Sequence, residues 1–250
     1  AIPVTTNLTL NTCASIYGSN ITFGANLAIA GTITTGTSKV LPASTGNQTT
    51  SGAGTIGITL EINKVTGSFD LGATYTGLNT TYGVINLISG TVNQNAYNIA
   101  TVRDINISGG TFNGSANSIS IGNTMTISGG TFVGSSGNIT CSGKFIQTGG
   151  IFTSTSNTLQ VGVAGSGNYS FDITAGIFNH NSGTVKVAGA NHSGWRNLEA
   201  YPVWNFESSQ CPTCSNVGTL YIDNNLLLTS VNSGTVVLKG NYTTVVGGVN

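Results

Sequence analysis

The sequence predicts an all-β fold, a parallel right-handed β-helix (β-solenoid) with coils of about 20 residues. The main observation is a repeated phrase that reads Ser-Gly-Gly-Thr-Phe at residues 108–112 and again at residues 128–132. Its phenylalanine returns at Phe152 and at Phe178, and Phe112, Phe132 and Phe152 are spaced 20 residues apart. A fixed period in this range is typical of a repeat architecture. An antiparallel β-sandwich would explain alternating strands and turns but not a strict period.

Columns of one residue type are the second observation. Between the glycine corners apolar residues alternate with polar ones, which indicates short strands with one face buried. Lining up the copies gives four inward columns: Ile99, Ile119, Ile139, Leu159 and Val185; Thr101, Ile121, Cys141, Val161 and Val187; Ile105, Met125, Phe145 and Phe171; and Ile107, Ile127, Gln147 and Ile173. Stacked copies would turn these columns into continuous internal ladders with a step of about 4.8 Å.

One solenoid domain spanning residues 1–250 is the simplest organisation. Residues 1–90 contain degenerate coils with a Ser/Thr/Gly-rich loop near 35–55, and residues 91–190 contain the regular repeats with an insertion near 162–169. Residues 191–215 form an insertion rich in aromatic residues and cysteine, and residues 216–250 return to terminal strands.

Charged residues make up only 6% of the chain, and its formal net charge is zero. Such a chain has no strong electrostatic field, so neither nucleic acid nor an anionic membrane is expected as a partner. No apolar run reaches the length of a membrane-spanning helix, which argues against membrane insertion. Solubility must come from hydroxyl and amide groups, as in many secreted, extracellular surface proteins. No signal peptide is visible, so a secreted chain would start at a processed Ala1.

A Pro-Val-Trp-Asn-Phe phrase at 202–206 and a Gly-Thr-Leu-Tyr-Ile phrase at 218–222 follow the glycine corners. Together these features resemble secreted prokaryotic parallel β-helix repeat proteins of the adhesin and surface-fibre type, over residues 90–240. The resemblance implies an extracellular structural role on a cell surface and transfers no catalytic residue. We therefore expect no enzyme activity, no cofactor and no metal site.

The aromatic segment is the strongest candidate for ligand binding. Trp195, Tyr201 and Trp204 could offer stacking faces to a carbohydrate, which would suit a cell-surface adhesin. Glu199 and Glu207 lie nearby, so a polysaccharide-degrading enzyme is a more distant alternative. The third alternative is a segment packed on the solenoid, with Arg196 neutralised by an acid and the tryptophan rings buried.

Cysteine and asparagine patterns predict covalent modification. Cys211 and Cys214 could form a short disulfide, and Cys13 could pair with one of them in a neighbouring subunit. Ten sequons make the chain a candidate glycoprotein, although many would arise by chance in so Asn-, Ser- and Thr-rich a sequence. The asparagines are Asn7, Asn20, Asn47, Asn79, Asn106, Asn113, Asn138, Asn168, Asn191 and Asn241.

Neither end of the sequence shows a charged, amphipathic cap, and strand-like residues run close to both ends. A self-similar stack with open ends favours head-to-tail self-association into a filament. The sequence therefore predicts a homopolymer, an extracellular fibre or sheath subunit, with glycans as further possible partners.

Overall fold

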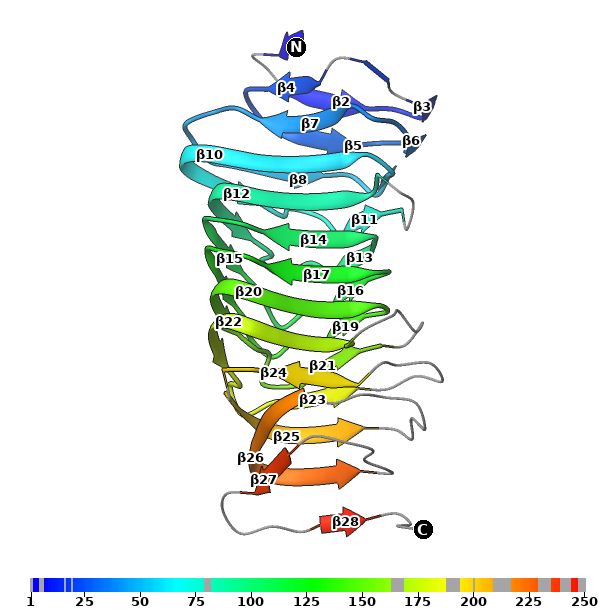
Figure 1. Ribbon diagram of the computed structural model, residues 1–250. Helices are drawn as coiled ribbons and strands as arrows, with labels where there is room; N and C mark the ends of the chain where they lie inside the picture. Colours follow the sequence, from blue (N-terminus) through cyan, green and yellow to red (C-terminus); the bar gives the residue numbers. More distant parts are fainter. Residues whose placement is uncertain are drawn as a thin grey trace.

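Parallel strands stacked along one axis form all the regular structure that can be described (Figure 1). The computed structural model describes residues 2–4, 7–15, 17–18, 20–78, 82–162, 169–187, 194–199, 201–208, 217–228, 235–238 and 244–246. Within these residues there is no helix, and the strands stack in about nine coils roughly 20 residues apart. The predicted β-solenoid is confirmed, whereas its right-handedness stays a prediction.

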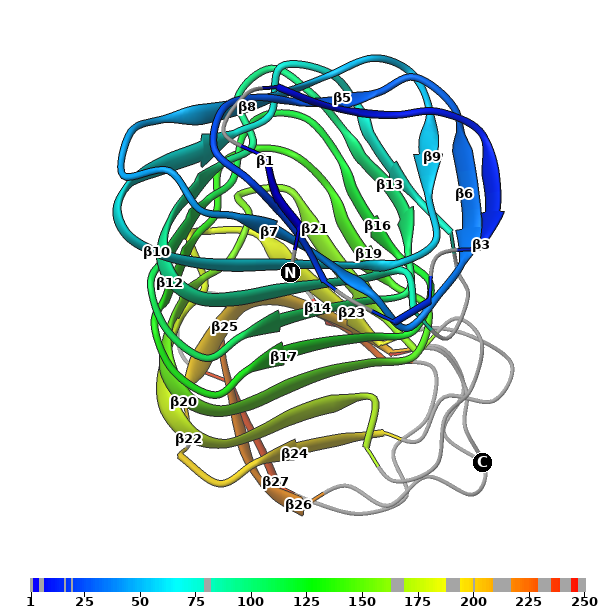
Figure 2. The ribbon, with the colours of Figure 1, turned by 90° about the horizontal axis from the view of Figure 1, so that it is seen from above.

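Each coil has three faces, which are visible in the view down the axis (Figure 2). The first face contains β1 (Ile2–Val4), β4 (Ile21–Phe23), β7 (Lys39–Pro42), β14 (Asp104–Ile107), β17 (Thr124–Ile127) and β24 (Trp195–Asn197). The second contains β2 (Leu8–Leu10), β5 (Leu27–Ile29), β8 (Gln48–Ser51), β15 (Thr111–Asn113) and β18 (Thr131–Val133). The third contains β3 (Cys13–Ser15), β6 (Thr32–Thr35), β9 (Thr55–Ile56), β11 (Tyr75–Gly77), β13 (Ile99–Val102), β16 (Ile119–Ile121), β19 (Ile139–Cys141), β21 (Thr158–Val161), β23 (Thr184–Val187) and β25 (Pro202–Ser208).

Longer strands bend around the corner from the first face to the second. They are β10 (Thr59–Asp70), β12 (Val84–Asn93), β20 (Lys144–Thr153) and β22 (Phe171–Asn179). Near the other end, β26 (Val217–Leu228) pairs with β25, β27 (Thr235–Leu238) and β28 (Thr244–Val246). Each strand thus pairs with the strand one coil away in parallel register, as predicted.

Phenylalanine ladders fill the interior of the central coils. The rings of Phe112, Phe132 and Phe152 stack with centroids 5.3 and 4.9 Å apart, and Phe178 continues the ladder at 5.7 Å. All four side chains are buried. Burying one such side chain contributes about 1.5–3 kcal/mol, and ring pairing adds about 0.5–1.5 kcal/mol, so the ladder is a principal source of stability.

One member of the predicted columns was wrong. Val102, and not Thr101, pairs with Ile121 and points inward. Thr101 is exposed and has a positive φ of 56°, because this strand carries one extra residue that reverses the alternation locally. The remaining members of the four columns are buried as predicted, including the polar Gln147.

Two segments expected outside the coils are part of them. The loop predicted near 35–55 contains β7 and β8, which pair with β4 and β5 in regular register. Residues 191–215 contain β24 and β25, which continue the ladders from β22 and β23. The insertion predicted near 162–169 falls largely on residues 163–168, which lie outside the described residues.

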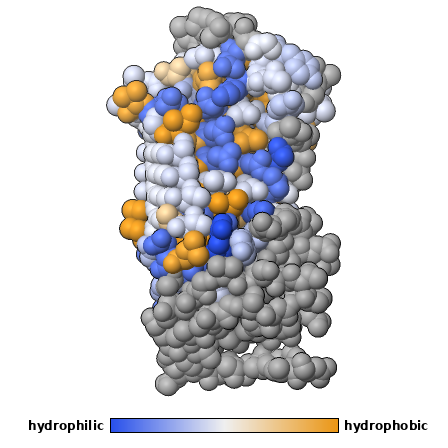
Figure 3. All heavy atoms as spheres, in the orientation of Figure 1, coloured by the Kyte–Doolittle hydropathy of each residue, from blue (hydrophilic) through white to orange (hydrophobic). Residues whose placement is uncertain are grey.

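Asparagine side chains connect the coils on the outside. Asn113 Nδ2 donates to Asn93 Oδ1 at 2.8 Å, and Asn93 Nδ2 donates to Asp70 Oδ1 at 2.6 Å. Figure 3 shows, on the same edge of the molecule as the stacked corners, a pale column of residues of intermediate hydropathy. Hydrogen bonds from asparagine amides to amide or carboxylate oxygens of the preceding coil therefore help to hold the outer surface together.

Candidate functional site

Of the three aromatic side chains predicted to stack on a carbohydrate, the structure excludes Trp195. Trp195 is 2% exposed because it continues the inward column of Phe145 and Phe171. Its ring cannot stack on a sugar from solution, so the prediction for Trp195 was wrong. Tyr201 is half-buried and packs against the core. Trp204 lies in β25, and its side chain is outside the described residues.

Arg196 is neutralised by an acid, as the structural alternative predicted. Its Nε and one terminal nitrogen donate to the two carboxylate oxygens of Asp172, both at 2.7 Å. The guanidinium also lies 4.7 Å from the centroid of the Tyr169 ring. The hydrogen bond to Asp172 raises the pKa of Arg196, since it favours the charged form. This bidentate pair joins two coils on the first face and neutralises the Arg196 guanidinium.

The acids of the possible enzyme site have different surroundings. Glu207 Oε2 lies 3.2 Å from Lys186 Nζ on the neighbouring strand, whereas Glu199 is exposed beyond β24. Asp104 pairs in register with Val84, and Asp172 pairs with Ile146, so these two acids lie in different columns and form no pair across neighbouring coils. In the described part of the chain, no three His, Cys, Asp or Glu side chains gather as a metal site would require.

Sequon asparagines have a structural role wherever they can be described. The side-chain oxygens of Asn7, Asn20, Asn47 and Asn138 each accept a hydrogen bond from a backbone N–H one coil away. Asn26 and Asn98 do the same without belonging to a sequon. Hydrogen bonding between coils is thus a structural reason for asparagine at these positions that does not involve glycans.

Glycosylation remains a prediction. Asn7, Asn47 and Asn138 are exposed, whereas the amide nitrogens of Asn106 and Asn113 donate to asparagines of the preceding coil. The sequons at Asn79, Asn168, Asn191 and Asn241 lie outside the described residues.

The predicted cysteine chemistry falls mainly outside the described structure. Cys211 and Cys214 are not among the described residues, and Cys13 lies in β3, where the side chains are not described. Cys141 is free and fully buried between Ile121 and Val161, as predicted. Its apolar surroundings raise the pKa of the thiol to about 12. Cys141 is therefore an inert core residue, because a buried thiol is not a nucleophile.

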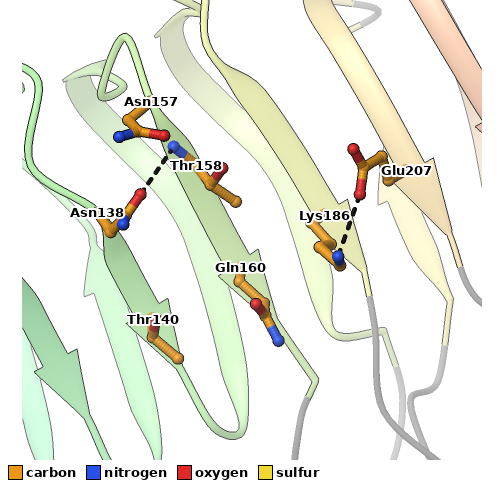
Figure 4. Close-up of a pocket in the computed structure, with 7 residues that line it drawn as sticks. All are labelled: Asn138, Thr140, Asn157, Thr158, Gln160, Lys186 and Glu207. Carbon is orange, nitrogen blue, oxygen red and sulfur yellow. Dashed lines mark hydrogen bonds and ion pairs between the residues drawn. The ribbon is translucent and has the colours of Figure 1, made fainter.

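A polar groove on the third face is the site that sequence reasoning missed (Figure 4). It has a volume of about 300 Å³ and crosses the outward side of β19, β21, β23 and β25. Its lining residues are all polar: Asn138, Thr140, Asn157, Thr158, Gln160, Lys186 and Glu207. The strand pairing places Thr140, Gln160, Lys186 and Glu207 in one column of successive coils. That column of polar residues at outward positions is the sequence signal that could have revealed the groove.

Comparisons with family models, with curated proteins and with solved structures give no match to this chain. What is established is therefore the parallel β-solenoid repeat fold and no particular family. Among the described residues, no helix has the length and apolar character needed to cross a membrane.

Proposed function

We propose that this protein is an extracellular structural protein, a subunit that assembles end to end into a filament, fibre or sheath on a prokaryotic surface. The observation that carries the proposal is the edge formed by β1, β2 and β3, which is unpaired within the described residues. In the described structure β1, β2 and β3 pair only with β4, β5 and β6 on one side. β2 and β3 each leave backbone donors and acceptors that can bind another strand, whereas Pro3 in the middle of β1 has no N–H to donate.

Hydrogen bonds in β2 identify the groups at that edge. Leu8 donates its backbone N–H to Asn26, and the carbonyl of Leu10 accepts from Ala30, both in the next coil. Successive residues of a parallel strand bond to opposite sides, so the N–H and C=O of Thr9 point away from that coil. A further coil of the same chain or a coil of another copy could bind there, and the proposal is that another copy does.

The surface supports an extracellular location. Uncharged amide and hydroxyl side chains form the outer ladders, and the cationic side chains Lys39, Lys186 and Arg196 are paired with acids. A surface with little charge provides little repulsion between identical copies, which favours self-association. Residues that block an edge, notably lysine and proline, are scarce in the chain, and of the strands β1, β2 and β3 only β1 contains one, Pro3.

Substituting Thr9 tests the proposal at the edge itself. Thr9→Pro removes the outward N–H without removing a hydrogen bond inside the solenoid, so we expect filaments to disappear from electron micrographs. Thr9→Val is the matched control, since it keeps the backbone donor and should assemble like the wild type. Circular dichroism and thermal unfolding of both variants should match the wild type, which separates lost assembly from lost folding.

Filaments formed equally well by Thr9→Pro would contradict this use of β2. Discrete particles formed by the wild-type protein would overturn the whole proposal and favour the second candidate, a carbohydrate-binding adhesin.

A further inference from the structure

The groove on the third face has unused hydrogen-bonding groups. Within the described structure, the side chains of Thr140, Asn157 and Gln160 form no hydrogen bond with another protein group. Asn138 uses one lone pair of its side-chain oxygen to accept from the N–H of Thr158 at 3.3 Å and keeps its amide donors. The groove therefore combines free donors and free acceptors in a small volume.

Charge in the groove is balanced. Lys186 Nζ and Glu207 Oε2 lie 3.2 Å apart at one end, and they are the only charged side chains in its lining. Both are partly exposed, with 40% and 37% of each side chain accessible. An anionic ligand would meet the carboxylate and a cationic ligand the ammonium, so the pair favours a neutral ligand.

The polar lining favours a carbohydrate over a protein surface as the neutral ligand. Protein interfaces have an apolar, often aromatic centre, and no lining residue of this groove is apolar. Carbohydrate hydroxyls are both donors and acceptors, and they match carboxamides, hydroxyls and a charged pair. Figure 4 shows Gln160 between Thr140 and Lys186, at successive steps along the stack. The step of about 4.8 Å between strands places one polar side chain per coil at a regular interval, which suits a chain of similar units.

From this geometry we propose that this groove, between Asn138 and Glu207 on the third face, binds a neutral oligosaccharide. Gln160 contributes hydrogen bonds at its centre, and the Lys186–Glu207 pair bounds one end. The proposal is independent of filament formation, because the groove lies on the side of the solenoid and not at an end of it.

Isothermal titration calorimetry with the full chain tests this binding. The probes are the neutral hexasaccharides cellohexaose, chitohexaose and mannohexaose, with polygalacturonate as the anionic comparison. We expect at least one neutral hexasaccharide to bind. Gln160→Ala should weaken that binding about tenfold, the effect of losing about 1.4 kcal/mol of hydrogen bonding.

Two arginine substitutions, one inside the groove and one outside it, form a matched pair of variants. Thr140→Arg places a long side chain in the groove and should abolish binding, whereas Thr126→Arg should not. Thr126 is also an outward threonine in the middle of a short strand, between Asn106 and Ile146 on the first face. The proposal is overturned if none of the three hexasaccharides binds at millimolar concentration, if only polygalacturonate binds, or if Thr140→Arg binds as well as Thr126→Arg.

Discussion

Two kinds of corner connect the first face to the second, a narrow one in the regular coils and a wide one in β10. In the regular coils the corner is narrow: Ile107 and Phe112, its last and first inward residues, are five positions apart. In β10 the equivalent residues, Ile62 and Phe69, are seven positions apart, and the register shifts between Asn63 and Ser68. Both corners contain a glycine with positive φ, Gly130 in a narrow corner and Gly67 in the wide one, but the wide corner also contains a buried lysine, Lys64.

In the narrow corner, the backbones of successive coils lie in close contact. Gly130 has a positive φ of 63°, and a Cβ atom at this position would lie 2.5 Å from the backbone carbon of Gly109. Only glycine fits both the conformation and the contact. Gly110 and Gly150 have similar φ values of 69° and 65°, so the same corner is stacked coil after coil.

In the wide corner, a buried lysine side chain fills the additional space. The Lys64 side chain is 2% exposed, and its Nζ donates to the carbonyl oxygens of Ser44 and Gly46 and to Gln48 Oε1, at 2.5, 3.0 and 2.7 Å. These acceptors belong to the corner of the preceding coil. The aliphatic part of Lys64 fills the wider interior, and the ammonium group replaces backbone partners that a narrow corner would supply. A longer corner is therefore tolerated when one side chain both fills volume and donates hydrogen bonds.

Breaking the narrow corner should have the largest effect. Gly130→Val would force a β-branched residue into the left-handed region and against the backbone of the neighbouring coil. We expect the free energy of unfolding to fall by more than about 3 kcal/mol, measured by urea denaturation. Gly46→Val is the control, because the nearest atom to a Cβ there is the Ser44 hydroxyl oxygen at 3.6 Å. An equal loss in both variants would show that backbone crowding does not define the narrow corner.

Removing the ammonium from the wide corner should have a moderate effect. Lys64→Met keeps most of the aliphatic volume but leaves the Ser44 and Gly46 carbonyls without their donor. We expect a loss of about 1–3 kcal/mol in the same denaturation experiment. Val65→Ser, at a position that is 95% exposed, should change stability by less than about 0.5 kcal/mol. If Lys64→Met were as stable as the wild type, the lysine would contribute volume alone.

The smallest expected effect is a pH dependence that only the wide corner has. Burial lowers the pKa of Lys64 from its ordinary value of 10.5, while the charge of Asp70 opposes that change. Between the lowered pKa and 10.5 the unfolded chain binds more protons at this residue than the folded chain. The contribution of Lys64 to stability therefore increases as pH rises through that window. The measurement is the difference in unfolding free energy between wild type and Lys64→Met from pH 7 to pH 10.5, and a difference that falls with pH would contradict the sign.

The regular coils could be predicted because each apolar column is repeated several times. The columns through Ile119, Met125 and Phe132 follow from period and alternation alone. An inward polar residue could be predicted within a repeated column, as Gln147 was, but not in the degenerate coils, where no such column is visible. Gln48 is buried and donates to the carbonyls of Phe23 and Ala25, so a polar segment that appears to be a loop is in fact strand β8. Hydropathy cannot show such a residue, because its partners lie in another coil.

The candidate site was harder to predict than the fold. Trp195 lies among polar and charged residues in the sequence, which suggested exposure, yet it alternates with Arg196 as Phe171 alternates with Asp172. Applying the same alternation here would have placed the ring inside. The polar groove depends on the lengths of the side chains in successive coils, from Thr140 through Gln160 to Lys186. Its depth therefore follows only once the register of the strands is known.

The proposed filament requires the coils to continue from one copy to the next. Cryo-electron microscopy of the native protein at neutral pH, followed by helical reconstruction, tests it most directly. We expect uniform filaments in which strands about 4.8 Å apart continue along the axis across every subunit boundary, with β1, β2 and β3 paired to a neighbouring copy. Monodisperse particles, or filaments joined through the sides of the solenoid, would contradict the claim.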